Sequence, residues 1–68
     1  MTITGPQRSR LFFIADGIGY WYGSSELKGA IRAVADSDDA QLASALIGAW
    51  NGGGWEEGLA GVLTARSA

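Results

Sequence analysis

Neither cysteine nor histidine occurs in this chain of 68 residues, and their absence limits how the chain can fold and act. A domain of this length buries only about 60% of the surface that its unfolded form exposes, so small domains commonly depend on disulfides, a metal or association. The composition excludes disulfides, zinc-finger ligands, cysteine nucleophiles and imidazole acid–base chemistry. We therefore expect one small domain that is supported by its apolar core and by contact with a partner.

The hydropathy of the chain is that of a folded soluble domain. Apolar residues make up 47% of the sequence, which is ordinary for a globular protein. The longest apolar run is far shorter than the roughly 18 residues of a membrane-spanning helix. No basic segment followed by an apolar stretch opens the sequence, so we expect no signal peptide and a cytoplasmic location.

The N-terminal third contains two runs of β-favouring residues, at 11–15 and 18–22, separated by Asp16-Gly17. Asp-Gly is a preferred pair for the type I′ turn that joins two antiparallel strands. The pattern predicts a β-hairpin over residues 10–23. Residues 1–9 are mostly polar and contain Gly5-Pro6, so we expect a flexible lead-in at 1–9 and a single small domain at 10–68.

The register of this hairpin determines which side chains share a face, because side chains alternate along a strand. With Asp16-Gly17 as the turn, one predicted face carries Leu11, Phe13, Ala15, Ile18, Tyr20 and Tyr22. The other carries Phe12, Ile14 and Trp21. Two amphipathic helices can cover only one face of a two-stranded sheet, so we expect the face with Phe12, Ile14 and Trp21 to stay open unless the C-terminal segment covers it.

Two helices are predicted after the hairpin, and a third segment is ambiguous. Apolar residues at helical spacing predict a helix over 25–35, which Ser24 and Ser25 can cap, and a second helix over 38–50. Residues 55–66 fit either a short helix followed by an extended tail, which we favour, or a strand at 62–65. The expected fold is therefore α+β, an N-terminal antiparallel β-hairpin packed against two or three short α-helices.

No motif predicts catalysis or a cofactor. Asp36-x-Asp38-Asp39 lacks the glycine at the sixth position and the glutamate at the twelfth position of a calcium-binding loop. The glycines at 17 and 19 and at 52–54 match neither a P-loop nor a dinucleotide-binding motif. We predict a protein that is not an enzyme and that has no metal and no cofactor.

The charge is unevenly distributed along the chain. Residues 1–35 carry four basic and two acidic side chains (+2), and residues 36–68 carry one basic and five acidic side chains (−4), which gives the net charge of −2. Nucleic-acid-binding domains typically have the opposite balance. Stacking of a single strand on the hairpin aromatics, with help from Arg8, Arg10 and either Lys28 or Arg32, is therefore an alternative that we consider weaker.

Tryptophan is abundant for so small a domain, with three in 68 residues. Exposed apolar patches and tryptophans are typical of protein interfaces. An acidic surface can also compete with nucleic acid for a basic groove on a partner. The predicted partner-binding residues are aromatic or aliphatic residues and acidic residues: Phe12, Ile14, Trp21, Trp55, Asp36, Asp38, Asp39, Glu56 and Glu57.

These observations favour a protein-binding module that acts by steric occlusion or acidic mimicry. Small, acidic, cysteine-free proteins of this kind are common among phage-encoded inhibitors of bacterial enzymes, including anti-CRISPR and related anti-defence proteins. The analogy is one of type, since no motif of a particular family is present. We therefore predict an inhibitor of this type, with a protein partner such as a nucleic-acid-handling enzyme and no membrane association. The principal alternative is a homodimeric structural or assembly subunit that pairs through the hairpin.

The homodimer alternative predicts a solution mass that rises with protein concentration, whereas an inhibitor that acts on another protein does not require self-association. Sedimentation or light scattering across a wide concentration range measures this directly. A constant monomer mass would contradict the homodimer.

Overall fold

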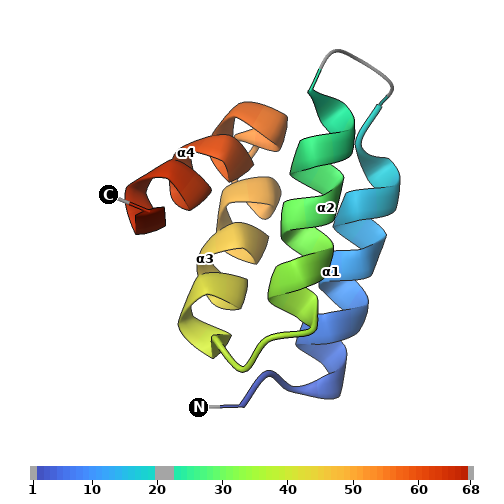
Figure 1. Ribbon diagram of the computed structural model, residues 1–68, viewed down its shortest axis with the longest axis vertical. Coiled ribbons are helices and arrows are strands. Elements are labelled where there is room, and N and C mark those ends of the chain that lie inside the picture. The colour runs from blue at the N-terminus through green and yellow to red at the C-terminus, as the bar shows by residue number, and fades with distance from the viewer. Residues whose placement is uncertain (1, 20–22, 68) are drawn as a thin grey trace.

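The computed structural model describes residues 2–19 and 23–67, and four α-helices account for most of them (Figure 1). The helices are α1 (Gly5–Gly17), α2 (Ser24–Ala35), α3 (Ala40–Asn51) and α4 (Trp55–Ser67). Helices α1, α2 and α3 lie side by side, and α4 packs against α3 on the outside. The described residues contain no β-strand. The α+β prediction is therefore wrong, and the fold is all-helical over the described chain.

Helix α1 begins within the segment that we expected to be a flexible lead-in. The backbone N–H of Gln7 donates to Oγ1 of Thr4 at 3.2 Å, and the N–H of Thr4 donates to Oε1 of Gln7 at 3.0 Å. These two bonds form a capping box, which satisfies amide groups that a helix N-terminus leaves unpaired. Pro6 suits the first turn because its fixed φ is already helical. Residues 5–9 are consequently ordered as the start of α1.

The predicted β-hairpin is wrong because its first strand is the second half of α1. A short unbroken apolar run such as 11–15 fits a strand and a buried helix equally well. Helical spacing connects Leu11, Ile14, Ala15 and Ile18 at i, i+3, i+4 and i+7, and all four are buried. Gly17 is the last residue of the helix and not part of a hairpin turn. The second predicted strand falls partly on residues 20–22, which lie outside the described residues.

Helices α2 and α3 confirm the two helices predicted from the apolar spacing. Leu27, Ile31 and Val34 form the buried stripe of α2. Asp39 caps α3, since its Oδ1 accepts from the backbone N–H of Leu42 at 3.0 Å. A carboxylate at this position satisfies an unpaired amide and interacts favourably with the helix dipole.

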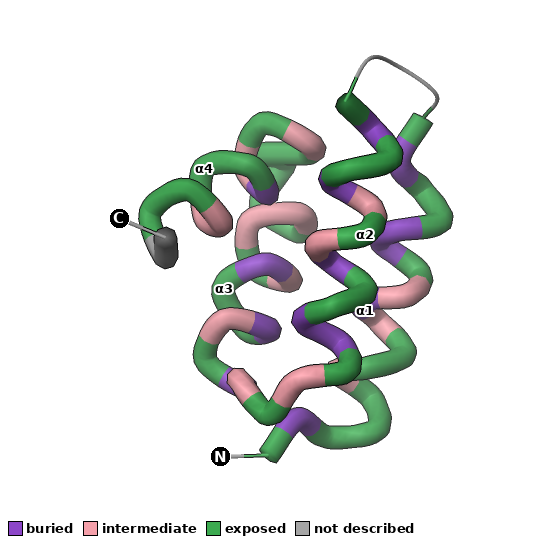
Figure 2. Tube along the Cα trace, viewed as in Figure 1, coloured by how far each residue is buried: buried purple, intermediate pink, exposed green. Residues whose placement is uncertain are grey.

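Helix α4 is continuous from Trp55 to Ser67, so the extended tail and the strand at 62–65 are wrong. Leu59 is the fully buried anchor of α4 among the described residues, and Val62 and Leu63 are half-buried beside it. Most of the remaining surface of α4 is exposed (Figure 2). The last helix is therefore attached mainly through α3.

The core lies where the inner faces of α1, α2 and α3 meet (Figure 2). Helix α1 makes its main contacts with both α2 and α3, whereas α2 and α3 contact each other little. Nε of Arg8 adds a polar link, because it donates to the carbonyl oxygen of Ala35 at the end of α2 at 2.9 Å. A basic side chain at a helix C-terminus satisfies a carbonyl that has no partner within the helix.

A pair of alanine substitutions in α1 distinguishes this helix from the predicted hairpin. Ile14→Ala removes a side chain with no exposed surface and should lower the free energy of unfolding by about 2–5 kcal/mol. Phe13→Ala removes a side chain that is 63% exposed, so we expect a loss of less than about 1 kcal/mol. Urea denaturation followed by far-ultraviolet circular dichroism measures both. The predicted hairpin would instead cover Phe13 and expose Ile14, so Phe13→Ala would then cost more stability than Ile14→Ala.

Candidate functional site

Two large hydrophobic side chains stand out on the surface of the described chain. The Phe13 side chain is 63% exposed and the Trp55 side chain is 57% exposed. Scattered exposed apolar residues are normal on a soluble protein and need no explanation. These two are different because each is the outer member of a group of contacts that joins α1, α3 and the start of α4.

Arg10 connects Phe13 to the end of α3. Its guanidinium carbon lies 5.1 Å from the centroid of the Phe13 ring, which is within the range of a cation–π interaction. Nη2 of the same side chain donates to Oδ1 of Asn51 at 2.7 Å. Arg10 therefore links α1 to the last residue of α3.

Trp50 and Trp55 form the second half of the group. Their ring centroids are 5.0 Å apart with an interplanar angle of 80°, the edge-to-face geometry that aromatic pairs favour. On its other side the Trp50 ring approaches α1, because a Cβ placed on Gly17 would lie 3.5 Å from Cζ2. We call Arg10, Phe13, Trp50, Asn51 and Trp55 the aromatic patch.

The backbone that presents Trp55 has an unusual conformation. Trp55 has a φ of 50°, which is the one positive φ at a non-glycine residue in the described chain. The chain is crowded just before it, since a Cβ on Gly54 would lie 3.0 Å from the carbonyl oxygen of Ala49 and 3.1 Å from Cα of Gly58. A left-handed conformation at a bulky residue costs about 1–3 kcal/mol, and such strain is concentrated at functional sites.

The predicted apolar contact residues are in different environments. Ile14 is completely buried and Phe12 is half-buried against the core, so the open hairpin face to which we assigned them does not exist. Phe13, which we expected to be covered, is the exposed member of the run. Trp21 lies outside the described residues. Of the four predicted apolar contacts, the described structure places Trp55 on the surface and in the aromatic patch.

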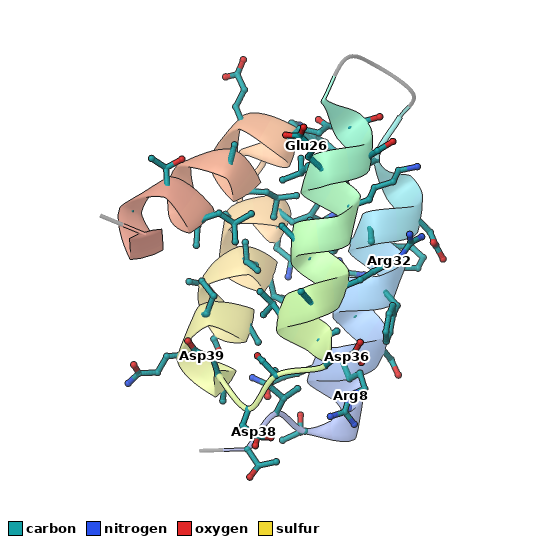
Figure 3. All side chains as sticks on the ribbon, viewed as in Figure 1. Arg8, Glu26, Arg32, Asp36, Asp38 and Asp39 are labelled. Carbon is teal, nitrogen blue, oxygen red and sulfur yellow. The ribbon has the colours of Figure 1, made fainter. Side chains whose placement is uncertain are left out.

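The predicted acidic residues form two separate groups. Asp36, Asp38 and Asp39 lie in the loop between α2 and α3, close to the N-terminal end of the chain (Figure 3). Glu56 and Glu57 lie in the first turn of α4. Helix α3 separates the two groups and is about 18 Å long from the rise per residue of an α-helix. The five carboxylates therefore do not form one acidic surface.

The basic residues named for nucleic-acid binding make contacts within the domain. Arg8 donates to the carbonyl of Ala35, and Arg10 contacts Phe13 and Asn51. Arg32 pairs with Asp16, with 3.3 Å between Nη2 and Oδ1. The stacking platform itself was placed on a hairpin that the structure replaces with α1.

A hollow of about 360 Å³ lies between the N-terminal half of α3 and the C-terminal half of α4. Its lining is uncharged and consists of Gln41, Leu42, Ala45, Val62 and Ala65. Within the described chain, no group of three or more acidic side chains is arranged to hold a metal ion. None of the helices found there has the length and hydrophobicity to cross a membrane.

Sequence reasoning missed Arg10, Phe13, Trp50 and Asn51 as members of the site. Arg10, Phe13 and Gly17 are spaced at i, i+3 and i+7, which places them on one side of a helix. That signal becomes visible once residues 5–17 are interpreted as helical. The convergence of this side of α1 with Trp50 and Trp55 is a tertiary contact without a local signature.

The chain matches no protein-family model, and no curated protein or solved structure shows significant similarity to it.

The geometry of Asp39 predicts a structural role for one of the proposed binding residues. Asp39→Ala removes the N-cap of α3 and should cost about 1 kcal/mol of stability. The exposed neighbour Asp38 makes no such cap, so Asp38→Ala should change the unfolding midpoint little. Thermal or urea denaturation of both variants tests this assignment, and equal midpoints would contradict it.

Proposed function

We propose that this chain is a non-enzymatic protein-binding module that blocks its partner by occlusion and that contacts the partner through the aromatic patch. The observation that carries the proposal is the presentation of Trp55. Its side chain is more than half exposed although its ring packs against Trp50, and its backbone is held in a left-handed conformation. Exposure of the Trp55 ring and strain in its backbone both raise the free energy of the domain. Burial of the ring against a partner would offset the cost of exposure.

The patch has the composition of an interaction hot spot. Tryptophan and arginine are enriched among the residues that dominate binding energy, and both occur here beside an exposed phenylalanine. Full burial of a large apolar side chain contributes about 1.5–3 kcal/mol. The rings of Phe13 and Trp55 are already held by Arg10 and Trp50. Binding therefore orders few additional side chains, which lowers its entropic cost.

Inhibition of a bacterial enzyme by a phage-type protein is the biological setting that we propose, on the analogy of size and composition. The structure changes the form of this proposal. The contact surface is centred on α1, the end of α3 and the start of α4, and not on a hairpin. The loop acids at 36–39 lie at the other end of α3 and are not part of that contact.

Site-specific photo-cross-linking tests the proposal. A photoreactive phenylalanine analogue replaces Phe13, Trp55 or, as a control, Ala33, which is exposed in the last turn of α2. In a bacterial lysate, we expect one protein to be cross-linked from positions 13 and 55 and not from position 33. The wild-type chain should then inhibit the activity of that protein, and the Trp55→Ala variant should not.

Two results would contradict the proposal. One is cross-linking that is equal from all three positions, which indicates non-specific contact. The other is undiminished inhibition by a Trp55→Ala variant whose circular dichroism spectrum matches that of the wild type.

A further inference from the structure

We infer that the partner surface that covers Trp55 is basic, with an arginine or lysine side chain placed over the Trp55 ring and paired with Glu56 or Glu57. The inference rests on the proposed function and specifies the chemistry of the partner. It commits to a protein that presents cationic side chains, and it excludes a nucleic acid as the ligand of this patch.

The first support is the distribution of charge around the patch. Helices α2 and α4 both begin at the end of the molecule where α1 and α3 finish (Figure 1). Their first turns contain Glu26, Glu56 and Glu57, and Lys28 follows directly after the first turn of α2. Figure 3 shows Glu26 at this end and Asp36, Asp38 and Asp39 toward the other. A partner with complementary potential is therefore positive where it meets Trp55.

The second support is the position of the basic side chains. Arg8 is bound to the carbonyl of Ala35, Arg32 is paired with Asp16, and Arg10 is held between Phe13 and Asn51. Lys28 also has an interaction within the chain. Among the described side chains, neither Glu56 nor Glu57 forms an ion pair. Glu57 is exposed and Glu56 is half-buried. The carboxylates that follow Trp55 in sequence can therefore accept a cation from outside the domain.

The third support is the pairing of residue types. The face of a tryptophan ring is the best aromatic site for a cation, and the planar guanidinium of arginine stacks on it while donating to a carboxylate. An exposed tryptophan followed by two glutamates supplies both partners of such a contact. Phosphate groups approaching the same ring would meet two like charges, which is unfavourable.

Acidic residues in the first turn of a helix also stabilise the helix through its dipole, so the test must separate this role from binding. Two double variants provide a matched pair: Glu56→Gln with Glu57→Gln, and Asp36→Asn with Asp38→Asn. Each raises the net charge from −2 to 0, but they do so at opposite ends of α3. The probe is an oligo-arginine peptide, and its binding to the full chain is measured by calorimetry at low ionic strength.

We expect the Glu56/Glu57 double variant to bind oligo-arginine about five- to tenfold more weakly than the wild type and with a smaller salt dependence. The Asp36/Asp38 double variant should stay within about twofold of the wild type. Trp55→Ala should weaken binding to an extent similar to that of the glutamate variant. Circular dichroism checks that α4 is retained in each protein.

Equal weakening by both double variants would overturn the inference, because it would show attraction to net charge alone. Unchanged binding by Trp55→Ala would overturn it as well. So would binding of an oligothymidine strand that is lost in Trp55→Ala, because the ligand would then be a nucleic acid. A further possible result is that Trp55→Ala abolishes inhibition of the cross-linked protein while the Glu56/Glu57 double variant still inhibits it. That result would support the proposed function and contradict the inference that the partner surface is basic.

Discussion

The apolar stripe of α1 is the contact on which the other packing in this domain depends. Leu11 and Ile14 are completely buried, and Ala15 and Ile18 extend the stripe to the end of the helix. Helix α1 is the element that contacts both α2 and α3, which contact each other little. In a domain that has neither disulfide nor zinc site, hydrophobic contact through α1 is the interaction that holds the first three helices together.

The same packing determines where the candidate site lies. Once Leu11 and Ile14 face inward, Arg10 and Phe13 are turned to the side of α1 that is next to the end of α3. The ring of Trp50 lies close to Gly17 there. The crowded glycines before α4 then bring Trp55 against Trp50. The aromatic patch is therefore a product of the core and not an independent surface feature, so a change in the core of α1 would also displace the patch.

The arrangement of the helices also changes the meaning of the charge distribution. In the sequence, the acids after residue 35 read as one negative half. In the fold, α3 places the loop acids and the glutamates of α4 at different ends. Asp39 has a role in capping α3, whereas Glu56 and Glu57 follow Trp55 in the first turn of α4. Negative charges at the two ends of α3 therefore have different roles.

Local signals in the sequence were sufficient for part of the fold. The apolar spacing and capping residues of 25–35 and 38–50 define α2 and α3 because a helical period and its caps are properties of neighbouring residues. The capping box of Thr4 and Gln7 also marks the start of α1, although Asp16-Gly17 and the β-favouring residues around it pointed to a hairpin. Within the candidate site, Trp55 was proposed from its residue type, and the structure places it on the surface.

Tertiary contact decided the rest. An unbroken apolar run carries no period, so the choice between strand and helix for residues 11–15 depended on which surfaces α2 and α3 offered to cover it. That choice buried Ile14 and exposed Phe13, the opposite of the hairpin register. The sequence by itself determined the helices at 25–35 and 38–50, an apolar core, abundant tryptophan and the absence of cysteine and histidine. Only the packing of α1, α3 and α4 brought Arg10 to Asn51, α1 to the ring of Trp50 and Trp50 to Trp55, because residues from 10 to 55 along the chain become neighbours only when the core is closed.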